Sequence, residues 1–348
     1  MVQLWIDALT PKQALFSKAL VERAPSKVKC TVTTRNYSEL NQFLSQINLK
    51  HTSVGRHGGG DLEEKLRASV DRQKLLIPLV SKSNFDYSLC FLSPEAARVS
   101  FGLGIKHYVC SDSPHANAPS RLAVPLSIGV FTPFPIHRER WTKYGITSAH
   151  VRKYHALDPW AWISGSKIRA TRKVHGRVLI RLEEWFASYF RSGMGVSDSV
   201  SRLIAGIKRL GDYEITLVPR YDDQRRWAKK KFGKECIVPE TTIDGASEIS
   251  KTDLLVGGGA TMTQEAALLG VPNISYFPSA ELDVFSNYYF PRKLSIEASN
   301  PSQLLNAALF LLKNIDKTKE EFITRAANET KTFEDPIRFI FDTLLTQD

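Results

Sequence analysis

Three consecutive glycines, Gly257, Gly258 and Gly259, follow a short apolar segment and precede a helical pattern. Glycines let the backbone approach a ligand closely, and the free N–H groups and dipole of a helix that opens at Thr261 favour a phosphate there. Glu265 follows about one turn later, where a carboxylate can accept both hydroxyls of a ribose. This spacing predicts a nucleotide-binding turn. A structural explanation also fits, in which Thr261 and Gln264 form a capping box after a tight turn.

Spacings that indicate a metal or redox site do not occur in the sequence. The eight histidines form no HExxH cluster, there is no GxxxxGK[ST] motif, and the four cysteines lie far apart without a CxxC pair. Such cysteines are typical of buried side chains in a reducing compartment, so we expect a cytoplasmic protein without a metal or cofactor. The amino terminus has no charged leader before an apolar run, and no apolar stretch approaches the ~20 residues of a membrane span.

The glycine turn belongs to a chain in which strands and helices alternate. In the first half, apolar runs predict strands at 2–7, 28–34, 51–54, 85–92, 107–110 and 129–134. In the second half they predict strands at 178–181, 213–219, 236–238, 253–256 and 273–277. Helical stretches between them imply βαβ crossovers and mostly parallel sheets. The sequence therefore predicts an α/β protein with two doubly wound, Rossmann-like domains, 1–165 and 166–348, facing across a cleft. The C-terminal helices are expected to pack back on the first domain.

Charge is unevenly distributed along the 348 residues, which are 43% hydrophobic and carry a net charge of +11. Residues 138–181 hold 11 Lys or Arg and 2 Asp or Glu, whereas residues 232–348 hold 10 Lys or Arg and 17 Asp or Glu. The basic stretch is interleaved with aromatic residues, so it fits contact with phosphate groups or an anionic membrane surface. A solvated basic face is the alternative, with Trp160 and Trp162 packed between the two halves. Binding of nucleic acid is not expected.

The run GATMTQEAALLGVP resembles the nucleotide-binding motif of GT-B-fold proteins such as the MurG glycosyltransferase and the non-hydrolysing UDP-N-acetylglucosamine 2-epimerase. Over nearly the whole chain, the sequence is more similar to a family of unknown function, found largely in archaea and filed as predicted glycosyltransferases. Segments that carry this similarity are WIDALTPKQALF, SPEAARVSFGLG, DSPHA, SRLAVPLS, RLEEWFASY, VPRYDDQRR and ISYFPS. The resemblance implies a GT-B-like fold, with Glu265 on the ribose and Gly258, Gly259 and Thr261 at the phosphates.

The sequence departs from the epimerases at their catalytic groups. A histidine of their second domain falls here on the loop at 181–184, which is Arg-Leu-Glu-Glu. One of their catalytic carboxylates corresponds to residues 117–119, Asn-Ala-Pro, which include no carboxylate. Another corresponds roughly to residues 93–95, Ser-Pro-Glu. Asp112 is the one plausible acidic replacement. Because epimerisation needs groups that move a proton at C2, the resemblance favours glycosyl transfer over 2-epimerisation.

Glycosyl transfer needs cations or N–H donors for the departing diphosphate and a base for the acceptor. Arg181, which ends a predicted strand, is the first candidate for the diphosphate, and Arg220, after the next strand, is the second. Asp112 and His115, in a loop after a strand of the first domain, are candidates for the base. For the arginines the alternative is a surface salt bridge, and for the histidine a solvated loop position.

These patterns predict a glycosyltransferase-like protein that binds a nucleotide-diphosphate sugar, in the first place a UDP-sugar, as its substrate. The absence of a DxD triplet, with the resemblance, predicts that no metal is needed. The acceptor is left open between a lipid-linked and a glycan hydroxyl, the former with peripheral membrane contact. The alternatives are a nucleotide-sugar epimerase or hydrolase, and a non-catalytic protein that binds a nucleotide sugar or an anionic surface.

Overall fold

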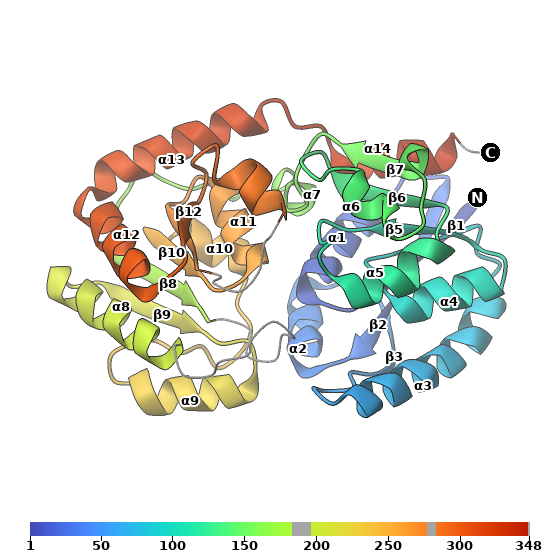
Figure 1. The fold of residues 1–348 in the computed structure, drawn as a ribbon, viewed down its shortest axis with the longest axis horizontal. Helices are drawn as coiled ribbons and strands as arrows, with labels where there is room; N and C mark the ends of the chain where they lie inside the picture. Colours follow the sequence, from blue (N-terminus) through green and yellow to red (C-terminus); the bar gives the residue numbers. More distant parts are fainter. Residues whose placement is uncertain (183–195, 277–282, 347–348) are drawn as a thin grey trace. The chain divides into compact units, whose positions relative to one another are not determined.

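The computed structural model describes residues 1–182, 196–276 and 283–346. The segments 183–189 and 277–279, which carry part of the family resemblance, lie outside them. The chain divides into two units, one of Met1–Ser164 with Phe333–Asp348 and the other of Gly165–Thr332. Each unit contains one parallel β-sheet with helices packed against it (Figure 1). This confirms the predicted α/β class with two parallel-sheet units.

The sheet of the first unit has seven strands in the order β3-β2-β1-β4-β5-β6-β7. The strands are β1 (Val2–Ala8), β2 (Val28–Asn36), β3 (Thr52–Arg56), β4 (Tyr87–Cys90), β5 (Lys106–Cys110), β6 (Gly129–Pro133) and β7 (Val151–Tyr154). The edge strand β7 was not expected from the sequence, because Arg152 and Lys153 interrupt its apolar pattern. Basic side chains on an edge strand oppose pairing with other chains.

The strands of the first unit are joined mainly by helices. These are α1 (Pro11–Glu22), α2 (Ser38–Ile47), α3 (Leu62–Ser81), α4 (Pro94–Gly102), α5 (Asn117–Ala123), α6 (Glu139–Thr142) and α7 (Trp160–Ile163), with 3-10 turns η1 (Val124–Leu126) and η2 (Ser148–His150). Local sequence explains where the helices begin. In α4, Ser93 accepts a hydrogen bond from the N–H of Ala96, and Pro94 occupies the first helical position.

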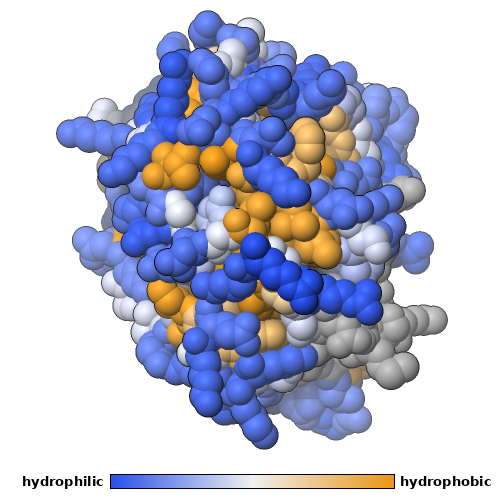
Figure 2. Space-filling view, turned by 90° about the vertical axis from the view of Figure 1, so that its left-hand side faces the viewer, coloured by the Kyte–Doolittle hydropathy of each residue, from blue (hydrophilic) through white to orange (hydrophobic). Residues whose placement is uncertain are grey.

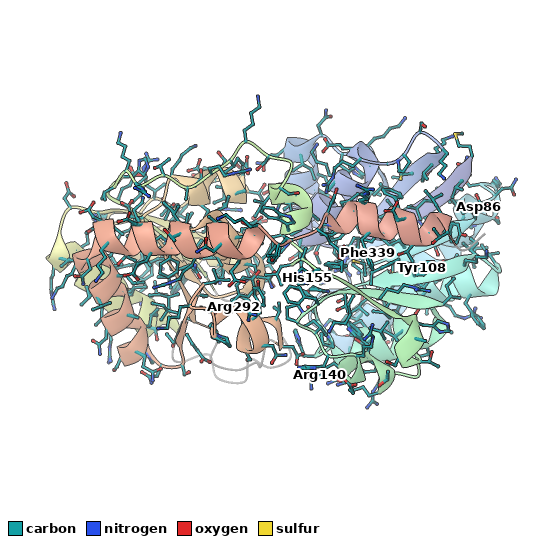
Figure 3. All side chains as sticks on the ribbon, turned by 90° about the horizontal axis from the view of Figure 1, so that it is seen from above. Asp86, Tyr108, Arg140, His155, Arg292 and Phe339 are labelled. Carbon is teal, nitrogen blue, oxygen red and sulfur yellow. The ribbon has the colours of Figure 1, made fainter. Side chains whose placement is uncertain are left out.

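The last helix, α14 (Pro336–Leu345), belongs to the first unit. Its apolar face is buried in the core of that unit, and the Phe339 ring lies 6.3 Å from the rings of Phe131 and Tyr154. Figure 3 labels Phe339 on this helix. Asp335, which caps the helix, also pairs with Arg23 at 3.0 Å. Trp160 and Trp162 pack against the core of this unit.

The second unit has a five-stranded sheet in the order β12-β11-β10-β8-β9. The strands are β8 (Arg177–Arg181), β9 (Glu214–Val218), β10 (Leu254–Gly257), β11 (Asn273–Tyr276) and β12 (Ile296–Ala298). The helices are α8 (Val196–Leu210), α9 (Asp222–Phe232), α10 (Gly245–Ser250), α11 (Ala260–Leu269), α12 (Pro301–Lys313) and α13 (Ile315–Thr330), with a π-turn η3 (Phe285–Tyr289). The predicted strand at 236–238 is only an isolated bridge between Ile237 and Thr216.

A buried ion pair attaches α13 to the second sheet. The Lys319 ammonium lies 2.7 Å from Asp253 Oδ1 and donates to the carbonyl of Lys173. The Asp253 carboxylate also accepts hydrogen bonds from the N–H groups of His175 and Arg177. Asp253 precedes β10, so this pair lies at the opposite end of the strand from the glycine turn. Within the part of the chain that the structure describes, no helix combines the length and apolar character needed to cross a bilayer.

His107 in β5 is enclosed by polar groups of the first unit. It is 1% exposed, with Nδ1 2.7 Å from Ser88 Oγ and Nε2 3.3 Å from Cys90 Sγ. Burial lowers the pKa of His107 to about 3, and the nearby charge of Asp7 offsets this only in part. The histidine is therefore a neutral member of the core.

The depressed pKa of His107 predicts a specific dependence of stability on pH. As pH falls below about 6.5, His107 is protonated in the unfolded chain but stays neutral in the folded chain. Stability is therefore lost at about 1.4 kcal/mol per pH unit until pH approaches 3. Replacing His107 by glutamine is expected to flatten this part of the curve. Urea unfolding of both proteins at pH 7, 6, 5 and 4.5 tests this, and parallel curves for the two proteins would refute it.

Candidate active site at a glycine turn of the second unit

The glycine turn lies where the strand order of the second sheet reverses. Strands β8 and β10 are neighbours, Arg181 is in register with Gly257, and the N–H of Gly258 donates to the carbonyl of Arg181 at 2.9 Å. The chain continues from β8 toward one edge of the sheet and from β10 toward the other. In doubly wound sheets, ligands bind beyond the carboxyl ends of the strands at this reversal.

The helix after the turn begins one residue earlier than expected. Helix α11 starts at Ala260, with Gly259 in the N-cap position and without a side-chain cap. Thr261 is therefore the second helical residue, half-exposed, and the predicted capping box with Gln264 does not form at this helix start. Its first turn contains no acidic residue. The N–H groups and dipole at this end thus favour an anion.

Arg220 lies directly against the glycine turn. A Cβ atom on Gly259 would come within 1.8 Å of Arg220 Nη2, so the guanidinium occupies the space that any other residue's side chain would need. Arg220 Nε donates to the carbonyl of Leu182 at 3.2 Å, and the Arg220 N–H donates to Gln224 Oε1 at 2.6 Å. Gly259 has an extended backbone with φ of −171°, so the close approach of Arg220, and not the conformation, requires glycine here.

Gly257 permits a second close approach, between the turn and its own helix. A Cβ atom on Gly257 would lie 1.8 Å from Thr263 Oγ1, and that hydroxyl donates to the carbonyl of Gly259 at 2.9 Å. Thr263 is fully buried. Sequence reasoning missed this role of Thr263, although its place two residues after Thr261 put it on the same helical turn.

Arg181 supplies a second cation at the same edge of the sheet. It ends β8, is half-buried, and its Nη1 donates to the carbonyl of Pro219 at 2.6 Å, just before Arg220. Strands β8 and β9 are adjacent, with Arg181 in register with Val218. The structure therefore brings together the glycines, Thr261, Arg181 and Arg220, as a site for a diphosphate requires.

Glu265 lies further along α11 than the turn. Its side chain is 2% exposed, and a Cβ atom on Gly245, the first residue of α10, would be 3.1 Å from Glu265 Oε2. The carboxylate thus packs where α10 meets α11, and it is buried where the sequence predicted an open position. Its role toward a ribose remains a prediction.

Asp112 and His115 belong to the first unit, in the loop between β5 and α5. Asp112 is 6% exposed, and its Oδ2 lies 2.6 Å from the Lys12 ammonium, which also lies 2.8 Å from Asp158 Oδ2. Burial would lower the pKa of Lys12, but the two carboxylates raise it above its usual value. Burial and the charge of Asp112 raise the pKa of Asp158. Asp112 is therefore part of an ion-paired cluster.

The loop that carries His115 is held in place by Tyr144. The Tyr144 hydroxyl lies 2.6 Å from the carbonyl of Pro114 and 2.6 Å from Asn117 Oδ1. His115 is half-buried. Sequence reasoning missed Lys12 and Asp158, the partners of this region, because Lys12 lies about 100 residues before Asp112 and nothing local links them. Among the described residues, no group of three or more His, Cys, Asp or Glu is placed to hold a metal ion.

A second buried ion pair fills the carboxyl end of β1. Arg72 of α3 contacts both oxygens of Asp7, through Nη1 at 3.0 Å and Nη2 at 2.6 Å, and its Nε donates to the carbonyl of Val54. Both side chains are at most 2% exposed. Burial would raise the pKa of Asp7, but the charge and hydrogen bonds of Arg72 lower it below its usual value. Asp7 thus has a structural role.

Solved structures with this fold span the whole chain. UDP-GlcNAc 2-epimerase from Neisseria meningitidis bound to UDP-GlcNAc is 14% identical, with 99% of this chain and 100% of that chain covered and a TM-score of 0.71. MnaA of S. aureus with UDP is 13% identical, with 99% of this chain and 96% of that chain covered and a TM-score of 0.74. The spinosyn rhamnosyltransferase SpnG with thymidine diphosphate is 13% identical, with 99% of this chain and 100% of that chain covered and a TM-score of 0.63. These similarities confirm the GT-B-like fold.

Sequence comparison identifies relatives of the whole chain. An uncharacterized protein of Methanocaldococcus jannaschii, MJ0665, is 23% identical over 320 residues, which cover 88% of this chain and 90% of the relative. The model of a family described as "Protein of unknown function (DUF354)" matches residues 2–347. The chain therefore belongs to the DUF354 family.

Proposed function

We propose that this protein binds a nucleotide-diphosphate sugar through its second unit and transfers the sugar to an acceptor. The observation that carries the proposal is the placement of the Arg220 guanidinium against Gly259, at the uncapped start of α11. A cation, helix N–H groups and a helix dipole converge there at the reversal of strand order. Structures with the same fold contain UDP-GlcNAc, UDP or thymidine diphosphate, which supports this ligand class.

The chemistry of transfer assigns a role to each group. As the bond between sugar and diphosphate breaks, negative charge grows on the leaving diphosphate. Arg220 and the N–H groups at the start of α11 stabilise that charge, with Arg181 as the second cation and the Thr261 hydroxyl as a further donor. Glu265 binds the ribose, which requires the carboxylate to exchange its packing against α10 for the ribose hydroxyls.

The first unit supplies the acceptor side. Asp112 would have to leave or share its ion pair with Lys12 to accept a proton from an acceptor hydroxyl. His115, in the same loop and half-buried, is the second candidate for the base. The acceptor that we propose carries a hydroxyl on a lipid-linked sugar or a glycan.

A thermal-shift screen tests the ligand class. UDP, GDP, dTDP and CDP, with their sugars, are added to the wild-type protein and to Arg220→Met. We expect one nucleotide to stabilise the wild type by about 2.7 kcal/mol at about 100 times its dissociation constant, and the variant much less.

Release of the free nucleoside diphosphate from a nucleotide sugar only when an acceptor is present supports transfer. Release without one indicates a hydrolase, and a C2-inverted nucleotide sugar indicates an epimerase.

A further inference from the structure

Helix α3 of the first unit exposes a stripe of apolar side chains along one side, interrupted between Val70 and Ile77 by Gln73. Leu62 is 80% exposed, Leu66 65%, Val70 55% and Ile77 48%. Their spacings of four, four and seven residues place them along one side of the helix. The side that packs against the unit is formed by Ala68, Arg72, Leu76 and Val80, which are buried. Figure 1 shows α3 on the outside of its unit.

A stripe of this length is unusual for a surface helix. Single exposed apolar residues are common, but contiguous ones mark a surface that another molecule covers. The helix has 20 residues, so the stripe extends over most of roughly 30 Å. The charges beside the stripe indicate what that molecule is.

Four exposed charged residues follow one flank of the stripe, in the order Glu63, Arg67, Asp71, Lys74. Their signs alternate as minus, plus, minus, plus, and within the helix Arg67 Nη2 lies 2.5 Å from Glu63 Oε1. If a second copy of α3 lies antiparallel, related by a two-fold axis near residue 69, Glu63 faces Lys74 of the other copy and Arg67 faces Asp71. The same axis sets Leu62 opposite Ile77 and Val70 close to its own symmetry mate. The four charges, the pair of Leu62 with Ile77, and Val70 thus fit one two-fold axis, whereas Leu66 falls opposite Gln73.

We propose that α3 forms the interface of a two-fold symmetric homodimer, with the two helices packed antiparallel along this stripe. The pattern fits a second copy of the chain better than an anionic membrane, because the four flanking charges sum to zero and a membrane surface selects cations. An isologous interface requires self-complementary charge, which this flank provides.

Sedimentation velocity at micromolar concentration tests the dimer. We expect the wild type to sediment with twice the 39.1 kDa mass of the chain. Val70→Asp places two like charges at the symmetry axis and is expected to raise the dimer dissociation constant at least about 100-fold. Phe310→Asp, on α12 of the second unit and 65% exposed, is the matched control and should remain dimeric. On the face seen in Figure 2, apolar side chains gather near the middle, with hydrophilic ones around and across them.

Charge reversal distinguishes the antiparallel arrangement from any other. Glu63→Lys and Lys74→Glu are each expected to weaken the dimer, and the double variant to restore it, because the reversed pattern is again self-complementary. Circular dichroism confirms folding of each variant. A monomeric wild type, a dimer that survives Val70→Asp, or a double variant no better than the single ones overturns the proposal. Binding of the wild type to phosphatidylglycerol vesicles that is lost in Val70→Asp would overturn it in favour of a membrane.

Discussion

Replacing Arg72 by methionine is expected to destabilise the first unit by about 3–5 kcal/mol, because it leaves the Asp7 carboxylate buried without its cation. The side chain also loses its hydrogen bond to the carbonyl of Val54, which attaches α3 to β3. A loss of this size is a large part of the about 5–15 kcal/mol that stabilises a typical protein. Urea unfolding gives the free energy, and hydrogen exchange in β1 and β2 assigns it to the first unit.

Two further variants separate the ion pair from general effects of mutation on α3. Lys65→Met removes an exposed cation of the same helix and should change stability by no more than about 0.5 kcal/mol. Arg72→Lys keeps the charge but loses the bidentate contact with Asp7. Its loss of unfolding free energy should therefore lie between those of Lys65→Met and Arg72→Met. If Arg72→Met unfolds at the same urea concentration as Lys65→Met, the pair does not stabilise the fold.

Replacing Gly259 by alanine is expected to weaken diphosphate binding by about 10- to 100-fold, since a charged hydrogen bond contributes about 1.5–3 kcal/mol. The new Cβ would lie 1.8 Å from Arg220 Nη2, so the guanidinium must move away from the turn. That group is the end of a flexible side chain, and its displacement should leave the stability of the unit nearly unchanged. Equilibrium dialysis with labelled UDP, together with thermal unfolding of the free protein, measures both effects.

Gly257→Ala provides the contrast for this experiment. Its Cβ would lie 1.8 Å from the hydroxyl and 3.2 Å from Cβ of Thr263, a short buried side chain of α11 that has little room to move. This variant should therefore lose stability as well as binding. Unchanged binding in Gly259→Ala, or an equal loss of stability in both variants, would contradict the proposed function of Arg220.

The sequence predicted the parts of the fold that local patterns determine. Alternating apolar runs predicted ten of the strands within a few residues, and the glycine turn predicted the junction of β10 and α11. Strand β7 was missed because an edge strand tolerates Arg152 and Lys153, so its pattern does not look apolar. The helix starts at Ala260, one residue before the expected Thr261, and Gly259 takes the N-cap position that the capping box gave to Thr261.

The candidate site could be predicted only in part. The sequence could place Arg181 and Arg220 at one edge of the sheet, because Arg181 ends β8, Arg220 follows β9 by two residues, and parallel strands end at one edge. The close contact of Arg220 with Gly259 depends on how β9 lies in the sheet, which no local pattern shows. For the same reason the ion pair between Lys12 and Asp112, formed by the start of α1 and the loop after β5, was not foreseen.

Isothermal titration of UDP into the wild type, Arg220→Met and Arg177→Met tests the central claim most directly. Arg177 is the matched control, because it begins the strand that Arg181 ends and is paired with Glu214 on the surface. We predict one site in the wild type, unchanged affinity in Arg177→Met, and affinity about 10- to 100-fold weaker in Arg220→Met. Equal affinity of all three proteins for UDP, or no binding of UDP, GDP, dTDP or CDP by the wild type, would contradict a diphosphate site at the start of α11.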